Sequence, residues 1–124
     1  MNTALLLIAH GSRRAEANAD AHTMAELLTA RGPSPCLAAF LELASPTIPD
    51  GARQCLDRGA SRIVLLPFFL SAGMHVTRDL QDWCVRLGQE YPQIQFLLAP
   101  PIGCHPLVVE VLAHQAAQAL VSSR

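Results

Sequence analysis

The sequence contains no lysine, so all nine of its basic residues are arginines. Ten acidic residues leave a formal net charge of -1. A nucleic-acid-binding protein neutralises phosphates with a clustered basic face, and no such cluster is visible along this chain. We therefore expect no nucleic-acid partner. The all-arginine composition has two interpretations, drift in a GC-rich genome and planar pairing of guanidinium groups with carboxylates.

Long apolar runs and closely spaced cysteines are also missing. The first apolar run, residues 4–9, is too short to span a membrane, and no signal peptide precedes it. The four cysteines lie too far apart for a CxxC zinc or redox motif. We expect no membrane partner, a cytoplasmic location, and free thiols of which most are buried.

Length and composition predict one domain that spans residues 1–124. A chain of 124 residues should bury roughly two-thirds of the surface that it exposes when unfolded. Apolar residues make up 51% of the chain and charged residues 15%. This balance excludes a disordered chain and a coiled coil.

Apolar runs alternate with helix-forming segments four times along the chain. Gly32-Pro33 is expected to end the first helix, and Ser45-Pro46 to supply the N-cap and first position of the second. The alternation predicts an α/β fold, a four-stranded parallel sheet with helices on both faces. The expected strands are 4–9, 36–43, 63–66 and 94–98, and the expected helices are 14–31, 46–58, 75–90 and 105–121.

Polar residues follow the predicted strands where a parallel sheet binds ligands, beyond the carboxyl ends of its strands. Three of the five histidines and one acid fall on this edge, an arrangement that suits a divalent metal of the first transition row. The residues at this edge, in strand order, are His10, Gly11, Ser12 and Arg13; then Glu42; then Phe68, Gly73 and His75; then Gly103, Cys104 and His105.

Each of these positions also has a structural interpretation. His10 could be a hydrogen-bonded residue at a strand end, and Glu42 could form an ion pair with a local arginine. Gly73 could only turn the chain, and His105 could cap or pack against the helix that follows it. Cys104 beside His105 is a weak signal for a soft-metal site, because no partner cysteine is near in sequence.

The turn at His10-Gly11-Ser12 has a further interpretation as an anion site at a helix N-terminus. The chain contains neither GxGxxG nor GxxxxGK[ST], so nucleotide binding has little support. It also lacks GxSxG, which argues against a hydrolase elbow.

Four blocks of sequence, each at the end of a predicted strand, resemble one known family. They are LIAHGSR at 7–13, FLELASP at 40–46, PFFLSAGMHV at 67–76 with Asp79 beyond it, and PPIGCHPL at 100–107. In this order they resemble the class II tetrapyrrole chelatases, in particular the short, single-domain sirohydrochlorin cobaltochelatases of the CbiX/SirB type. The resemblance covers essentially the whole chain and implies a chelatase-like half-domain.

The resemblance implies a metal-inserting enzyme. His10 and His75 would hold the incoming metal and help to remove the pyrrole protons, and Glu42 would face the same cavity as a third catalytic residue. The expected metal is Co²⁺, with Fe²⁺ or Ni²⁺ as the alternative, and it is a substrate rather than a permanent cofactor. The expected substrate-binding residues are Ser12, Arg13, Phe68 and Gly73.

The implied partners are a sirohydrochlorin-type tetrapyrrole and a second copy of the chain in a symmetric homodimer. Because the tetrapyrrole carries many carboxylates, arginines are candidate anchors for it. A different class of function, a non-catalytic metal or tetrapyrrole carrier, stays open, and a closed four-ligand metal site would favour it. The candidate anchors are Arg13, Arg14, Arg53 and Arg78.

Overall fold

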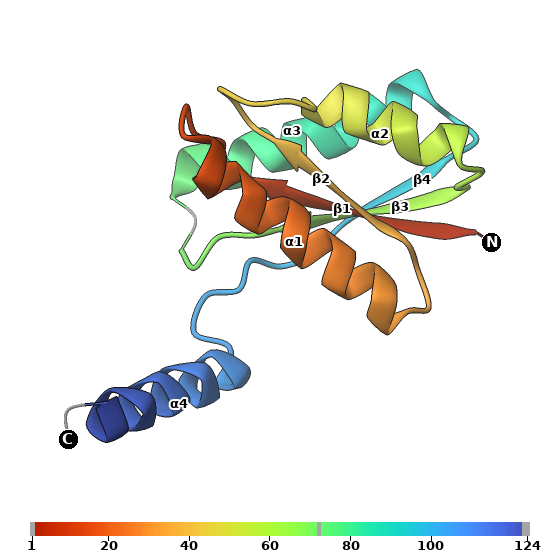
Figure 1. Ribbon diagram of the computed structural model, residues 1–124. Coiled ribbons are helices and arrows are strands. Elements are labelled where there is room, and N and C mark those ends of the chain that lie inside the picture. The colour runs from red at the N-terminus through yellow and green to blue at the C-terminus, as the bar shows by residue number, and fades with distance from the viewer. Residues whose placement is uncertain (1, 72, 123–124) are drawn as a thin grey trace.

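The computed structural model describes residues 2–71 and 73–122. Strands and helices alternate four times, as the sequence predicts (Figure 1). The strands form one parallel sheet in the order β2-β1-β3-β4. The elements are β1 (Thr3–Ala9), α1 (Ala15–Arg31), β2 (Cys36–Phe40), α2 (Ile48–Asp57), β3 (Arg62–Pro67), α3 (Met74–Glu90), β4 (Gln95–Leu98) and α4 (Pro106–Ser122).

The central strand β1 explains the continuous apolar run near the N-terminus. It pairs with β2 on one side and β3 on the other, so that Leu6 lies between Leu37 and Leu65 in register. A strand that is covered on both faces needs apolar side chains in both directions of the pleat. Leu6 and Ile8 accordingly point to one face, and Leu7 to the other.

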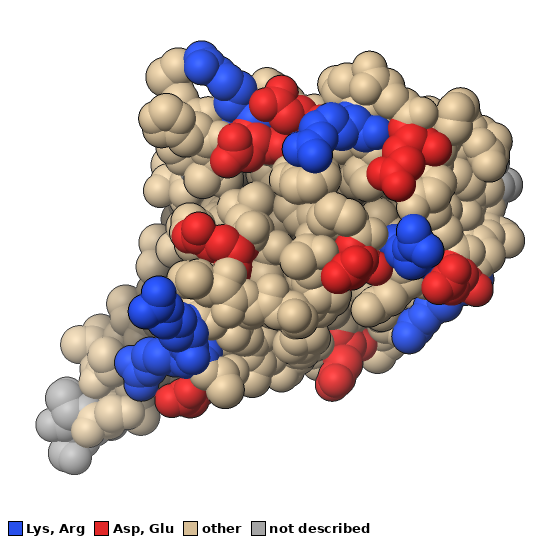
Figure 2. All heavy atoms as spheres, turned by 90° about the horizontal axis from the view of Figure 1, so that it is seen from above, with Lys and Arg blue, Asp and Glu red and all other residues tan. Residues whose placement is uncertain are grey.

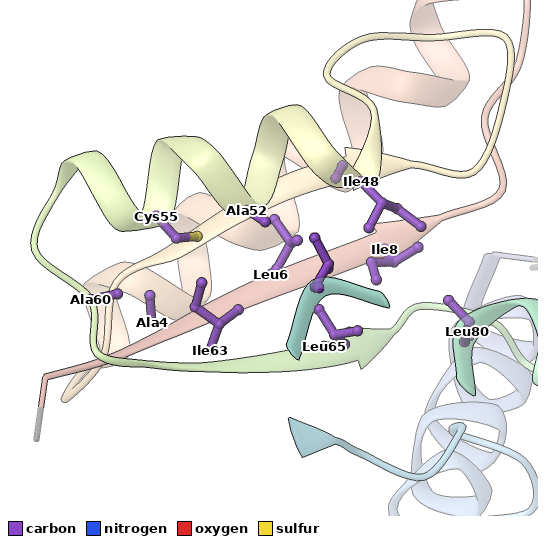
Figure 3. Packing of buried hydrophobic residues seen from close by; sticks show 12 residues of the cluster. Ala4, Leu6, Ile8, Ile48, Ala52, Cys55, Ala60, Ile63, Leu65 and Leu80 are labelled. Atoms are coloured by element: carbon purple, nitrogen blue, oxygen red, sulfur yellow. The ribbon is translucent and has the colours of Figure 1, made fainter. Parts of the chain in front are cut away.

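Helices cover the two faces of the sheet unequally. On one face α2 and α3 enclose the larger core, in which Leu6, Ile8, Ile63 and Leu65 are fully buried (Figure 3). On the other face α1 packs over β2 and β1 through Ala21 and Ala25. The small side chains on α1 let the helix lie close to the sheet.

The predicted start of the second helix at Ser45-Pro46 is wrong. The helix begins at Ile48, and the Thr47 hydroxyl caps it by accepting a hydrogen bond of 3.3 Å from the backbone N–H of Asp50. The physical reason lies in the preceding residue, because the carbonyl of Pro46 accepts the N–H of Phe40 at 2.9 Å. That bond ties residue 46 to the end of β2.

The second strand is also shorter than predicted. It ends at Phe40, and Glu42 lies in the following loop rather than late in the strand. Leu43 has φ 65°, a conformation that no strand residue adopts, and it turns the chain away from the sheet. Glu42 consequently stands at the carboxyl edge of the sheet, next to the end of β1.

The last helix stands apart from the rest of the molecule. Figure 1 shows α4 leaving the carboxyl end of β4 on an extended connection and lying away from the sheet. None of its residues is buried, although most of them are apolar. The prediction of helices on both faces is therefore met by α1, α2 and α3, and α4 covers neither face.

The surface carries charges of both signs. On the face drawn in Figure 2, arginines and acids are interspersed rather than gathered by sign. All four cysteines are free thiols, as predicted, but only Cys36 and Cys55 are buried. The prediction that most of the thiols are buried is wrong, because Cys84 is half-buried and Cys104 lies on an exposed connection. Within residues 2–71 and 73–122, the helices are too short or too polar for any of them to traverse a bilayer.

Candidate functional site

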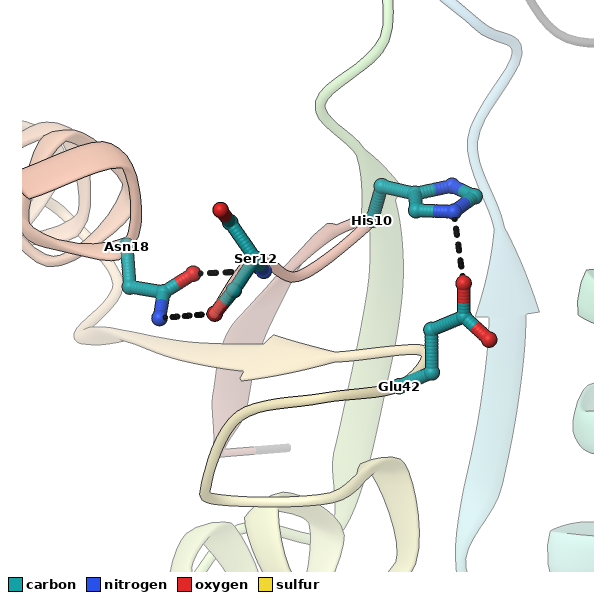
Figure 4. A network of polar contacts seen from close by, with 4 residues as sticks. All are labelled: His10, Ser12, Asn18 and Glu42. Atoms are coloured by element: carbon teal, nitrogen blue, oxygen red, sulfur yellow. Dashed lines mark hydrogen bonds and ion pairs between the residues drawn. The ribbon is translucent and has the colours of Figure 1, made fainter. Parts of the chain in front are cut away.

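A histidine–carboxylate pair stands at the carboxyl edge of the sheet. His10 directly follows β1, and its Nε2 lies 2.9 Å from Oε1 of Glu42 (Figure 4). Both side chains are 57% exposed, so the pair is open to solvent and to ligands. Glu42 thus pairs with His10 and not with a local arginine, the alternative that the sequence leaves open.

The backbone fixes the spacing of this pair. The N–H of Glu42 donates to the carbonyl of His10 at 3.1 Å, which joins the two loops directly. Gly11 has φ 100°, and a Cβ at this position would overlap the carbonyl oxygen of Glu42. Only glycine permits both the backbone angle and the close approach.

Asn18 holds the loop that follows His10, and sequence reasoning missed it. Its side-chain oxygen accepts from the N–H of Ser12 at 2.9 Å, and its amide nitrogen donates to the carbonyl of Ser12 at 2.8 Å (Figure 4). The available signal was an asparagine in the first turns of an alanine-rich helix, where it is a poor helix former. Its two bonds anchor the turn to α1.

The carboxylate orients the imidazole. An ionised carboxylate can only accept, so Nε2 of His10 donates to Glu42, and in the neutral imidazole Nδ1 then carries the lone pair. Proteins commonly hold metal-binding imidazoles in this way, with one ring nitrogen donating to a carboxylate. The ring of Phe69 meets His10 edge-on, with the ring centres 6.4 Å apart.

His75 is exposed in the first turn of α3. The start of this helix lies at the carboxyl end of the sheet (Figure 1). Among the described residues His75 has no hydrogen-bonding or ion-pair partner, and no three potential ligands gather into a metal-binding group. A hollow of about 280 Å³ lies beside it, lined by Met74, Thr77, Arg78 and Gln81. The structure brings His10 and Glu42 together, and the convergence of His75 with them stays a prediction.

The other residues predicted to bind substrate lie around the same edge. Ser12 makes local bonds, its Oγ accepting the N–H of Arg14 at 3.0 Å, while Arg13 is exposed. Phe68 is half-buried against the α1 side of the sheet. Gly73 is the N-cap residue, directly before the start of α3. Their roles toward a ligand stay predictions.

His105 has a structural role, and burial lowers the reactivity of three of the four cysteines. Nδ1 of His105 accepts the N–H of Leu107 at 3.1 Å, so this histidine caps α4. Burial raises the pKa of Cys36, of Cys84 and of Cys55, the last to about 11. Thiols with raised pKa values stay protonated and are poor metal ligands.

A cavity of about 590 Å³ opens at the opposite, amino-terminal edge of the sheet. Its lining includes Thr3, Pro33, Arg58 and Arg62, with neither a histidine nor a carboxylate. General acid–base or metal chemistry would need such groups. The His10–Glu42 pair is therefore the stronger candidate, although it lies on an open surface.

Fold and site together define a parallel α/β domain whose carboxyl edge carries a histidine–glutamate pair. The chain belongs to the CbiX family, whose model matches residues 4–119. The family predicted from the four sequence blocks is thereby confirmed.

Individual relatives agree with this assignment. The chain is 32% identical to a chloroplastic sirohydrochlorin ferrochelatase from Arabidopsis thaliana, over 87% of this chain and 48% of that protein. It is 33% identical to a sirohydrochlorin cobaltochelatase from Sulfolobus acidocaldarius, over 94% of this chain and 91% of that protein. It therefore spans less than half of the first relative and nearly all of the second.

A solved structure confirms the fold. The sirohydrochlorin chelatase SirB from Bacillus subtilis subspecies spizizenii, in complex with cobalt, superposes with a TM-score of 0.86 at 32% identity. The match covers 95% of this chain and 51% of that one.

Proposed function

We propose that this chain inserts a divalent metal ion, cobalt, into sirohydrochlorin, and that residues 1–124 act as one chelatase-like domain. The observation that carries the proposal is the open His10–Glu42 pair, held by backbone contacts at the carboxyl edge of the sheet. The names of similar proteins, sirohydrochlorin cobaltochelatase and sirohydrochlorin ferrochelatase, supply the substrate.

The chemistry of the pair suits this reaction. Insertion replaces two pyrrole N–H protons by a dication, so the site needs a base and a ligand from which the metal can leave. Nδ1 of His10, left free by the bond from Nε2 to Glu42, can accept a proton or bind a metal. Glu42 stabilises the imidazolium that forms when the ring takes a proton.

His75 is proposed as the second residue that holds the metal. It is exposed at the same edge, and α3 presents it beside Arg78. The guanidinium of Arg78 suits a carboxylate of the tetrapyrrole, since such pairs form two parallel hydrogen bonds. We propose Arg13, Ser12, Phe68 and Gly73 as the other substrate contacts.

We also propose a symmetric homodimer in the cytoplasm. A reducing compartment is consistent with the four free thiols. The exposed apolar helix α4 offers a surface through which two copies can associate.

Iron is the alternative metal. The chain is similar both to a ferrochelatase and to a cobaltochelatase, and imidazole with carboxylate binds both ions. A metal carrier is the alternative of a different class. The openness of the His10–Glu42 pair favours turnover over tight storage, because a storage site encloses its metal.

The test follows the visible spectrum of sirohydrochlorin after addition of Co²⁺, Fe²⁺ or Ni²⁺, with the uncatalysed rate as reference. We expect acceleration by the native chain and its loss in His10→Ala and His75→Ala. Removal of one such group should lower the rate by about 100-fold or more. The metal that gives the greatest acceleration identifies the substrate.

His22→Ala is the matched control for His10→Ala. Both histidines are exposed, and each meets a phenylalanine ring edge-on, Phe69 for His10 and Phe40 for His22. The control should keep full activity. Bound tetrapyrrole without acceleration by any metal would replace the chelatase proposal with the carrier.

A further inference from the structure

The cavity at the amino-terminal edge of the sheet is enclosed by three separate segments. They are the first residues of β1, the α1–β2 connection and the α2–β3 connection, and Figure 1 shows the two connections on either side of the N-terminal end of β1. The volume of about 590 Å³ lies within the range of pockets that bind small molecules, about 300–1,000 Å³. The His10–Glu42 pair stands at the opposite edge of the sheet, so the cavity is a separate site.

Backbone hydrogen bonds fix the three segments to one another. The N–H of Leu5 donates to the carbonyl of Pro35 at 2.8 Å, which joins β1 to the α1–β2 connection. The N–H of Ser61 donates to the carbonyl of Asn2 at 2.9 Å, which joins β1 to the α2–β3 connection. The cavity is therefore formed before any ligand enters, and binding does not have to order its walls.

Arg62 offers the ends of its guanidinium to the cavity. Its Nε donates to Oγ1 of Thr3 at 3.0 Å, and this bond holds the partly buried side chain in place. Within residues 2–71 and 73–122, its two terminal nitrogens have neither a hydrogen-bond acceptor nor a carboxylate as partner. A guanidinium held in this way suits the two oxygens of a carboxylate or phosphate group.

Arg58 brings a second positive charge from another wall. It is the C-cap residue of α2, and no carboxylate of the described chain forms an ion pair with it. Burial raises the pKa of the Cys55 thiol to about 11, and the positive charge of Arg58 acts in the opposite direction. The guanidinium is therefore close enough to the buried wall at Cys55 for its charge to act there.

The two arginines outweigh the negative charge at this edge. No acidic residue lines the cavity, but the carboxyl ends of α1 and α2 both lie beside it. Each helix end contributes about half a negative charge, so two guanidiniums leave an excess of about one positive charge. The cavity therefore attracts an anion.

The floor of the cavity is apolar, formed by Ala4, Leu37 and Ala60. Ala4 and Ala60 are buried at this end of the core, beside Cys55 (Figure 3). A bare inorganic anion would leave the floor in contact with water, whereas an apolar body would cover it. The lining thus fits a molecule with an acidic end and an apolar body.

We propose that this cavity binds a small organic anion, a dicarboxylate or a phosphate ester, whose acidic groups pair with Arg58 and Arg62 and whose body lies on the apolar floor. The lining contains no group for acid–base or metal chemistry, so the ligand is bound and not converted. The proposal does not depend on the chelatase reaction, because no residue of the His10–Glu42 site takes part.

The test titrates the native chain with phenyl phosphate and with phthalate, in phosphate-free buffer of low ionic strength, by calorimetry and amide NMR. We expect a dissociation constant no higher than about 1 mM for at least one of them. Chemical shifts should change at the amides of Asn2, Leu37 and Ala60 and stay constant at Ser12 and Glu42. The tighter ligand identifies the preferred acid group.

Ser34→Glu should weaken binding by about 10-fold or more, because the new carboxylate in the cavity wall competes for the arginines. Ser34→Gln is the matched control, with the same size and no charge, and should bind as the native chain does. The hydroxyl of Ser34 has no partner among the described residues, so both variants keep the contacts of the fold.

Arg62→Gln should also weaken binding by about 10-fold or more. Arg86→Gln removes the same charge outside the cavity, on α3 over the ring of Trp83, and should leave the affinity unchanged. Circular dichroism verifies that each variant keeps its α/β fold. If Arg62→Gln fails this check, Arg58→Gln takes its place.

Four results would overturn the proposal. One is the absence of binding by either ligand, and another is a set of shift changes confined to Ser12, Arg13 and their neighbours at the opposite edge. Inorganic phosphate that binds as tightly as phenyl phosphate would show that the apolar floor has no part. Benzyl alcohol that binds as tightly would show the same for the arginines.

Discussion

The α2–α3 side of the sheet and the helix α4 are both rich in apolar side chains, yet the first is buried and the second is exposed. Leu65 has no exposed surface, whereas Leu112 is 65% exposed. The side chains beneath α2 and α3 are covered because each of these helices returns to the sheet directly after its own strand, β2 or β3. An apolar surface is stabilised when another apolar surface covers it. The connecting segment of the chain decides which surface can reach it.

Truncating one leucine in each region should distinguish the buried core from the exposed helix most clearly. Leu65→Ala should lower the free energy of unfolding by about 2–5 kcal/mol at every protein concentration, because it opens a cavity inside one chain. Leu112→Ala should lower it only where the dimer is populated, since binding adds stability by mass action. Urea unfolding at several protein concentrations measures both. Equal, concentration-independent losses would show that α4 packs within its own chain.

Gly11→Ala tests the site within the packed region. The new methyl group meets the carbonyl of Glu42 and the backbone has a positive φ, so we expect a loss of about 2–3 kcal/mol and of the His10–Glu42 geometry. Gly59→Ala is the control, because Gly59 has φ 91° but open space at its Cβ. It should cost about 1 kcal/mol. Similar losses in both would assign the whole effect to φ.

Asn18→Ala should have a smaller effect on stability and a clear one on the loop. It removes both bonds to Ser12, at a cost of about 1–2 kcal/mol. Hydrogen exchange at the Ser12 amide should become faster, while the core amides are unchanged. Asn18→Asp keeps the acceptor and should restore most of the protection. Unchanged exchange in the alanine variant would mean that the turn holds itself.

Thr47→Ala gives the smallest expected change. Loss of the cap on α2 should cost about 1 kcal/mol, measured by thermal unfolding. Thr47→Ser keeps the hydroxyl and should be nearly neutral. If Ser45→Ala were the more damaging change, the cap would lie where the sequence first indicated.

Sequence reasoning located the elements well and their ends less well. The apolar runs and the glycine at residue 32 gave the strands and the end of α1, because these signals are local. The cap moved from Ser45 to Thr47 because of a bond between Pro46 and Phe40, which no local pattern contains. The separation of α4 also escaped prediction, since an apolar helix normally packs on its own sheet.

The site was predictable in part for the same reason. His10 and Glu42 each follow a strand, and neighbouring parallel strands bring such residues to one edge. Asn18 was missed because its role depends on how α1 lies over the turn at Ser12. The place of His75 relative to His10 depends on the path of the chain between β3 and α3, which no local sequence pattern determines.

The backbone hydrogen bond between the His10 and Glu42 loops affects how this site can evolve. Main-chain bonds and one missing Cβ set the distance between imidazole and carboxylate. Several side chains on the surrounding rim are exposed and do not set this distance, among them Leu43, Leu70 and Met74. Mutation can therefore reshape the rim for a different ligand while the reacting pair stays in place.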